Sequence, residues 1–322
     1  MNIVFTSVIR KIGLTSYGGA IFSAEVDIKE PTIILKHYFQ KITNEVKIEQ
    51  LKNFVANEKG IKEEFDSLPC QKYHKCCVAR KPENIDSKHR YYFSQAYDHN
   101  RVILKMMFSD EDSNDYIAAS RVDSFLIPGR FIATQAPLPE TFADFWKMIY
   151  DYNCSQIVTL NELFEDGLTK GHKYWPEEAT SKQFGSILVK NNEIREGNDF
   201  TLNFYDLTGY KGTLKVEHYF YKEWPDHGVP NDPKSFLNLI KVVKQSPAHQ
   251  TIKPVVVHCS AGAGRSCTFI LIYNMIEMGE KCGNVDIYKY FLQLRTQRAY
   301  AVETLKQYNF VYECLIDYFS NN

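Results

Sequence analysis

The segment at 254–269 (PVVVHCSAGAGRSCTF) constrains the fold of this chain more than any other part of it. A short run of valines, typical of a buried strand, leads into a loop of small residues and then into a stretch typical of a helix. The loop residues after the serine are Ala261, Gly262, Ala263 and Gly264. Because such small residues let backbone N–H groups converge beside the positive end of a helix, this strand–loop–helix unit predicts a phosphate-binding site.

Cys259 lies at the start of this loop, where the same N–H groups and helix dipole favour a thiolate over a thiol. The sequence therefore predicts Cys259 as a nucleophile. Arg265 supplies a planar guanidinium that can hold two phosphoryl oxygens. Ser266 is expected to hydrogen-bond the thiolate as it leaves, and His258 to orient the loop from behind. Taken alone, a single cysteine or a single glycine-rich turn is more often structural.

Charge and composition exclude several classes of protein. The chain has 38 basic and 39 acidic side chains, a net charge of -1, so no attraction to nucleic acid or an anionic membrane is expected. Apolar residues make up 44% of the chain, which is typical of a globular protein and not of a disordered one. No stretch approaches the roughly 18 apolar residues that span a bilayer, so we expect no integral membrane association.

The eight cysteines indicate a reducing compartment. They include no CxxC pair, which argues against zinc, and they are too sparse for a disulfide scaffold. We therefore expect no metal and no cofactor. At the N-terminus, Arg10 and Lys11 follow the apolar start instead of preceding it, which argues against a secretory signal. A weak targeting or surface helix there is an alternative to a plain packing segment.

Local patterns predict an α/β (α+β) fold with a strand-rich middle flanked by helices. Helices are predicted at 31–65 (two), 141–152, 233–243, 265–278 and 305–319. Strands are predicted at 156–160, 186–190, 199–206, 213–222 and 254–257, with further strands and turns between 91 and 132. Thr141 is expected to cap its helix, with Asp144 closing a capping box. The glycine turns between 186 and 222 predict a meander.

The loop and eight further segments of the chain together resemble the conserved motifs of a known enzyme family. The loop itself matches the C-x5-R signature of cysteine-dependent phosphatases. The further blocks are Lys88–Tyr91, Tyr97–Val102, Asn114–Ser120, Phe131–Pro139, Asp144–Trp146, Lys173–Pro176, Trp224–Gly228 and Gln307–Tyr308. In order and spacing they resemble the phosphotyrosine-specific protein tyrosine phosphatase family, from about residue 60 to 320. The resemblance implies a single domain with a central twisted mixed sheet flanked by helices.

The resemblance also implies roles for side chains outside the loop. Asp226 would be the general acid that protonates the tyrosine oxygen as it leaves, and then the base. Tyr91 would pack against the phosphotyrosine ring. By their chemistry alone, Asp226 would be an ordinary turn residue and Tyr91 a strand aromatic.

The phosphate itself would be bound by Arg265 and the loop, whose residues are Ser260, Ala261, Gly262, Ala263 and Gly264. Glu165 would support Arg265, and Lys170 would approach the loop that carries the acid. The alternative for Glu165 and Lys170 is a solvated loop charge.

One departure from the family concerns the second chemical step. Glu303 stands where the family has a glutamine that orients the water attacking the phosphocysteine. A carboxylate about 4 Å from a phosphoryl dianion would be unfavourable by roughly 1 to 4 kcal/mol. Gln307, which is retained, could position the water instead, so we expect slowed rather than abolished turnover.

Other departures concern the substrate and the scaffold. Phe93 replaces an aspartate that usually binds the substrate backbone, so peptide preference should change. The bulk of Tyr300 would disfavour a second, adjacent phosphotyrosine. Ala118, Ala136 and Cys267 replace the usual asparagine, glycine and glycine, where we expect a modest loss of rigidity.

The sequence therefore predicts a protein-tyrosine phosphatase that acts through a phosphocysteine on phosphotyrosine-containing proteins, in cytoplasmic signal transduction. The alternative is a phosphotyrosine-binding or substrate-trapping pseudophosphatase, but the retained Cys259, Arg265 and Asp226 favour the enzyme. The scattered changes resemble the diverged phosphatases of parasitoid-wasp polydnaviruses, which would place the protein in host-cell cytoplasm. Residues 31–320 are assigned to the phosphatase domain, and 1–30 to an extension of unknown role.

Overall fold

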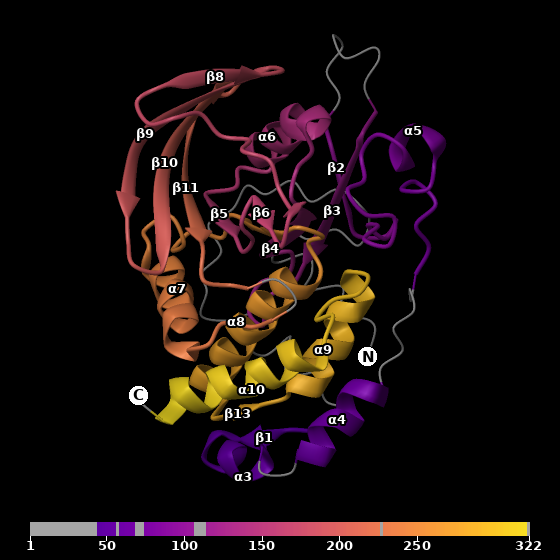
Figure 1. The fold of residues 1–322 in the computed structure, drawn as a ribbon, viewed down its shortest axis with the longest axis vertical. Helices are drawn as coiled ribbons and strands as arrows, with labels where there is room; N and C mark the ends of the chain where they lie inside the picture. Colours follow the sequence, from indigo (N-terminus) through magenta and orange to yellow (C-terminus); the bar gives the residue numbers. More distant parts are fainter. Residues whose placement is uncertain (1–43, 56–57, 68–73, 106–113, 226–227, 321–322) are drawn as a thin grey trace, which may run out of the picture. The chain divides into compact units, whose positions relative to one another are not determined.

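A nine-stranded mixed sheet is the centre of the computed structural model (Figure 1). The structure describes residues 44–55, 58–67, 74–105, 114–225 and 228–320. The strand order is β2-β3-β4-β12-β5-β11-β10-β9-β8. The bounds are β2 (Arg101–Ile103), β3 (Tyr116–Val122), β4 (Phe131–Gln135), β5 (Gln156–Thr159), β8 (Ser181–Phe184), β9 (Ile187–Glu196), β10 (Phe200–Gly209), β11 (Gly212–Tyr221) and β12 (Val255–Cys259).

The inner strands of this sheet are parallel and the outer strands antiparallel. β12 pairs in parallel with β4 and β5, and β11 pairs in parallel with β5. All five residues of β12 are buried, as its unbroken run of valines predicts. The parallel strands β4, β12 and β5 end side by side at Gln135, Cys259 and Thr159. Loops that follow these carboxyl ends therefore meet at one edge of the sheet.

Helices cover both faces of the sheet. They are α6 (Phe142–Asp151), α7 (Pro233–Gln245), α8 (Gly264–Cys282), α9 (Ile287–Gln297) and α10 (Leu305–Ser320). On β4, Ile132 lies in the core cluster of Trp146 from α6, whereas the Phe131 ring lies 6.5 Å from that of Phe269 in α8. Because consecutive strand residues point to opposite faces, α6 and α8 lie on opposite sides. α10 packs on α8 and α7 (Figure 1).

Shorter elements complete the described part of the chain. They are β1 (Val46–Lys47), η1 (Ile48–Gln50), α3 (Leu51–Val55), α4 (Glu58–Ser67), α5 (Pro82–Ile85), η2 (Pro139–Thr141), β6 (Phe164–Glu165), β7 (Leu168–Thr169) and β13 (Asn284–Val285). Glu64 in α4 accepts hydrogen bonds from Tyr308 and Tyr312 of α10, at 3.0 and 2.7 Å. These bonds attach the first described helices to the rest of the domain.

Most of the predicted elements are confirmed. β9, β10 and β11 form the predicted antiparallel meander, and the fold is the expected α/β arrangement with a central mixed sheet. Helix α9 was not predicted. The predicted helices at 31–65 correspond to α3 and α4 only in part, since 1–43 lie outside the described residues. No helix in the described ranges has the length and apolar character needed to span a membrane.

The predicted capping box at the start of α6 is wrong. The Thr141 side chain makes no capping bond to α6; its Oγ1 accepts from Leu138 N at 2.9 Å and so serves the preceding turn η2. Asp144 instead forms an ion pair with Lys88, at 2.9 Å. A half-buried lysine offers this carboxylate a stronger partner than a backbone N–H.

Candidate active site

The loop between β12 and α8 holds the backbone against Cys259. Residues 259–264 are called the Cys259 loop below. Cys259 is 4% exposed, and Gly262 N lies 3.2 Å from its Sγ. Gly262 has a φ of +67°, and a Cβ added to it would lie 2.0 Å from Thr134 O of β4. Only glycine can therefore occupy this position, which explains the small residue in the sequence.

Arg265 lies in the first turn of α8 and is held by a carboxylate. Its Nη1 and Nη2 donate to Glu165 Oε1 and Oε2, at 2.6 and 2.7 Å, and Nη1 also donates to Leu160 O at 3.2 Å. Both side chains of the ion pair are buried. Glu165 lies on the β6–β7 hairpin, whose turn residues Asp166 and Gly167 both have positive φ. A bidentate pair of this kind fixes the plane of the guanidinium.

Ser260 connects two further predicted residues. Its Oγ donates to Lys170 O at 2.7 Å, so it accepts the hydrogen bond from Tyr91 OH at 3.0 Å. The structure thus brings the Tyr91 ring and the backbone of Lys170 to the same side of the Cys259 loop. The Lys170 side chain is buried, at 8% exposure.

His258, just before Cys259, is part of a buried polar network beneath the loop. Its Nε2 lies 2.7 Å from Thr159 Oγ1 and 2.8 Å from Tyr174 OH. Thr159 Oγ1 is also 2.8 Å from His218 Nε2, and Tyr205 OH is 3.0 Å from His218 Nδ1. Burial lowers the pKa of His258 to about 3 and the pKa of His218 well below its ordinary value. Both imidazoles are therefore neutral at physiological pH.

Arg298 holds the Cys259 loop through two of its backbone carbonyl groups. It is fully buried, and its guanidinium donates to Gly262 O at 3.0 Å and to Ala261 O at 3.2 Å. It also bonds the hydroxyls of Ser94 and Ser120. Sequence reasoning missed Arg298, because nothing in its neighbourhood marks an arginine at a helix end as buried. It also missed Thr159, Tyr174 and His218, although Tyr174 falls within one of the matched blocks.

Glu303 precedes α10 and Gln307 lies in the first turn of α10, and both side chains lie near Gly264 at the start of α8. Glu303 N donates to Gln307 Oε1 at 2.9 Å. A Cβ added to Gly264 would lie 2.9 Å from Gln307 Nε2 and 3.1 Å from Glu303 Oε2. Glu303 is exposed, whereas Gln307 is 6% exposed. Both predicted residues are therefore beside the Cys259 loop.

Two predicted residues are not positioned by these contacts. Ser266 Oγ is buried and finds no hydrogen-bond partner among the described residues, so its bond to Cys259 stays a prediction. Asp226 lies outside the described residues. Its neighbour Trp224 is 2% exposed, and its Nε1 donates to Gly228 O at 2.9 Å. This bond joins the two described ends of the segment that carries Asp226.

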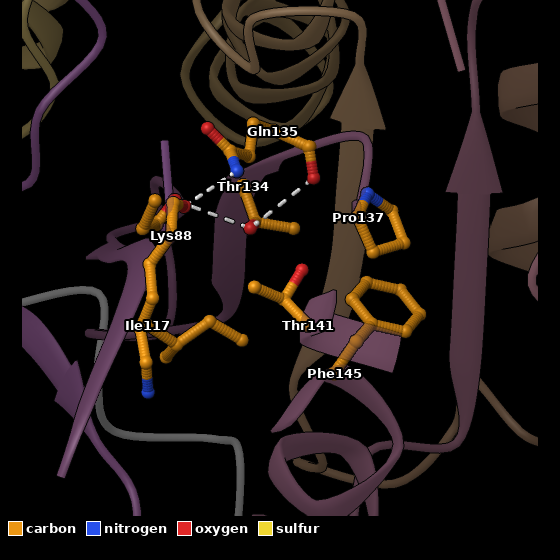
Figure 2. A pocket seen from close by; sticks show the side chains of 8 residues that line it. Lys88, Ile117, Thr134, Gln135, Pro137, Thr141 and Phe145 are labelled. Atoms are coloured by element: carbon orange, nitrogen blue, oxygen red, sulfur yellow. Dashed lines mark hydrogen bonds between the residues drawn. The ribbon is translucent and has the colours of Figure 1, made fainter. Parts of the chain in front are cut away.

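A small pocket lies near the site but differs from it (Figure 2). It has a volume of about 10 Å³, and Figure 2 shows Ile117, Thr134 and Phe145 around it. A cavity that holds no more than about one water molecule is too small for an aryl phosphate. Within the described ranges, no group of three or more histidine, cysteine or acidic side chains is placed to hold a metal ion.

Comparisons with known proteins agree with this geometry. The family model for protein-tyrosine phosphatase matches residues 85–317. The chain is 36% identical over 290 residues to human receptor-type tyrosine-protein phosphatase C, covering 89% of this chain and 21% of that protein. It is 37% identical over 272 residues to a Lar-like tyrosine-protein phosphatase of Caenorhabditis elegans, covering 84% of this chain and 12% of that protein.

The chain is also 36% identical over 278 residues to the rat receptor-type tyrosine-protein phosphatase zeta, covering 80% of this chain and 12% of that protein. The chain therefore spans only 12% to 21% of the length of these curated relatives. The matched region contains Tyr91, the Cys259 loop, Arg265 and Glu303. The chain belongs to the protein-tyrosine phosphatase family, as a catalytic domain.

Proposed function

We propose that this chain hydrolyses phosphotyrosine in proteins through a phosphocysteine formed on Cys259. One arrangement carries the proposal. The Gly262 N–H points at Cys259 Sγ in a loop whose following helix presents Arg265, and Glu165 orients that guanidinium at 2.6 and 2.7 Å. Backbone N–H groups and a fixed guanidinium are the donors that a phosphoryl dianion requires.

In the first step, the Cys259 thiolate attacks the phosphorus atom. The S–P bond forms while the P–O bond to tyrosine breaks, and the electron pair of that bond goes to the phenolic oxygen. Asp226 gives this oxygen its proton. Arg265 and the N–H groups of the Cys259 loop hold the three other phosphoryl oxygens.

In the second step, water attacks the phosphorus of the phosphocysteine. Its proton passes to the Asp226 carboxylate, and the electron pair of the S–P bond returns to Cys259. Inorganic phosphate leaves, and the enzyme has its starting proton again. Gln307 positions the water, because its side chain lies beside Gly264 at the end of the loop.

Glu303 supports a second candidate function, a substrate trap. Its carboxylate also lies beside Gly264, where it would oppose the approach of a phosphoryl dianion. If this repulsion slows the attack of Cys259 on the phosphorus enough, the protein would bind phosphotyrosine proteins and hold them without dephosphorylating them.

Rapid mixing of enzyme with an excess of phosphotyrosine peptide tests both functions, provided that the enzyme is concentrated enough for one equivalent of product to be measured. We expect the native chain to produce dephosphorylated peptide over many turnovers and Cys259→Ser to produce none. A burst of about one equivalent followed by near silence, relieved in Glu303→Gln, would show that hydrolysis of the phosphocysteine fails, so that each molecule dephosphorylates one substrate and then stops. Tight peptide binding with no burst at all would contradict catalysis.

The same proposal includes the domain limits and the cellular setting. Residues 31–320 form the phosphatase domain and 1–30 an extension. The domain acts on phosphotyrosine proteins of signalling pathways in cytoplasm. A truncation that begins at residue 31 should keep the turnover of the full chain.

A further inference from the structure

Three aromatic rings form a continuous row beside the Cys259 loop. The Tyr91 and Phe93 rings are stacked with centroids 5.4 Å apart, and the Phe93 and Tyr300 rings meet edge to face, also at 5.4 Å. Tyr91, Phe93 and Tyr300 are called the aromatic rim below. Phe93 is 37% exposed and Tyr91 and Tyr300 are half-buried, so an apolar surface continues outward from Tyr91. A row of this kind resembles a binding surface more than a core.

The first part of the rim is fixed to the loop. Tyr91 to Ser94 form a turn in which Ser94 N donates to Tyr91 O at 3.2 Å. At one end Tyr91 OH bonds Ser260, and at the other Ser94 Oγ donates to Ala261 O. Phe93 therefore keeps a set position relative to Cys259, and little conformational freedom is lost when a ligand binds.

The second part of the rim is held in an unfavourable backbone conformation. Tyr300 has a φ of +59°, which L side chains rarely adopt. Its neighbours Ala299 and Ala301 are fully buried, and Arg298 next to them is bonded to the loop. Non-glycine residues kept in this region cluster at functional sites. The strain here places an aromatic ring against Phe93.

The rim carries no charge that would hold a charged ligand. The segments YYFSQAY at 91–97 and AYAV at 299–302 contain no acidic or basic residue. An acidic side chain seated on these rings would lose hydration without gaining a partner, whereas an aliphatic or aromatic one would gain by burial. Neighbouring Cα atoms in a chain are about 3.8 Å apart, so a residue next to phosphotyrosine can reach a ring 5.4 Å from Tyr91.

We propose that the aromatic rim binds a large apolar side chain directly beside the phosphotyrosine, so that the substrates of this phosphatase are sequences with aliphatic or aromatic flanking residues. The inference rests on the proposed function, with the phosphotyrosine ring against Tyr91.

The proposal is tested with two phosphotyrosine peptides that differ only in the residues on either side of phosphotyrosine. These residues are leucine in one peptide and glutamate in the other. We expect kcat/KM for the native chain to favour the leucine peptide about tenfold, as partial burial of one leucine side chain implies. Phe93→Ser and Tyr300→Gly, which remove a ring without adding a charge, should each bring this ratio toward one. Leu188→Ala, which removes a side chain of similar exposure (38%) on β9, is the matched control and should keep it.

Para-nitrophenyl phosphate, which has no flanking residues, separates the two proposals. If the native chain does not turn it over, the proposed function fails, and the affinity of Cys259→Ser for the two peptides then gives the ratio instead. Equal kcat/KM values, or equal affinities, for the two peptides would overturn the proposal that the rim binds an apolar side chain. A preference for the glutamate peptide, or an unchanged ratio in Phe93→Ser, would also overturn it.

Discussion

Gly262 is the residue at which the Cys259 loop comes closest to the sheet. The space that a side chain would need is occupied by Thr134 O, and the backbone has a φ of +67°. A substitution here meets two separate obstacles, a backbone clash and an unfavourable φ. Gly212 has only the second, with a φ of +100° and nothing within 4 Å of the added Cβ.

This contrast gives a prediction at the scale of one residue. Gly212→Ala should lower the free energy of unfolding by about 1 to 2 kcal/mol, the cost of a left-handed backbone. Gly262→Ala should cost more, about 3 kcal/mol or above, and should also remove activity, because Thr134 O and Gly262 must separate. Urea unfolding and turnover of an aryl phosphate measure both effects. Equal losses of stability in the two variants would show that the clash is relieved without cost.

Among the elements, four strands contribute to the network around His258. His258 comes from β12, Thr159 from β5, His218 from β11 and Tyr205 from β10. The strands lie side by side in the sheet, so a row of polar groups crosses its buried face just below Cys259. Thr159 Oγ1 is the atom that joins the two histidines.

Removal of this one hydroxyl tests the role of the network. Thr159→Val keeps the shape of the side chain but leaves buried imidazole nitrogens with fewer partners, so the free energy of unfolding should fall by about 1 to 3 kcal/mol. Because His258 precedes Cys259, kcat/KM for an aryl phosphate should fall about tenfold.

Thr159→Ser is the matched variant, since it keeps the hydroxyl and loses only a methyl group. It should retain kcat/KM close to the native value and lose at most about 1 kcal/mol of stability. If the valine and serine variants have the same kcat/KM, the hydroxyl does not position His258.

On the scale of the whole molecule, the domain holds three neutral histidines, of which His218 and His258 are buried and His249 is half-buried. Burial lowers the pKa of His249 and His258 to about 3, and that of His218 well below the ordinary 6.5. Below pH 6.5 the unfolded chain takes up protons on these groups, whereas the folded chain does not until about pH 3. Their contribution to stability is therefore complete above pH 6.5 and is lost as the pH falls toward 3.

We expect the free energy of unfolding to decrease between pH 7.5 and 5.5. Each histidine can contribute up to about 1.4 kcal/mol per pH unit within this window. Urea titrations at intervals of pH measure the slope, and His249→Gln should make it shallower because one titrating group is removed. A stability that is constant or increases as the pH falls would contradict this account.

The sequence by itself determined the features that depend on neighbours along the chain. The valines before Cys259 and the small residues after it predicted β12, the loop and the start of α8, and the structure has all three. The meander between β9 and β11 followed from alternating strands and glycine turns. Such patterns are readable because period and turn chemistry act over a few residues. The predicted cap at Thr141 was nevertheless wrong, because its hydroxyl accepts a hydrogen bond from Leu138 N and makes no capping bond to α6.

Only the tertiary structure decided which distant side chains meet at the loop. Glu165 reaches Arg265 across 100 residues of chain, and Arg298 reaches Gly262 across 36. The family resemblance suggested the first contact, but no local pattern marks Arg298 as buried or joins Thr159 to two histidines. Burial and partnership depend on how the sheet brings separate strands and loops together, and this packing is not encoded in the spacing of residues along any one segment.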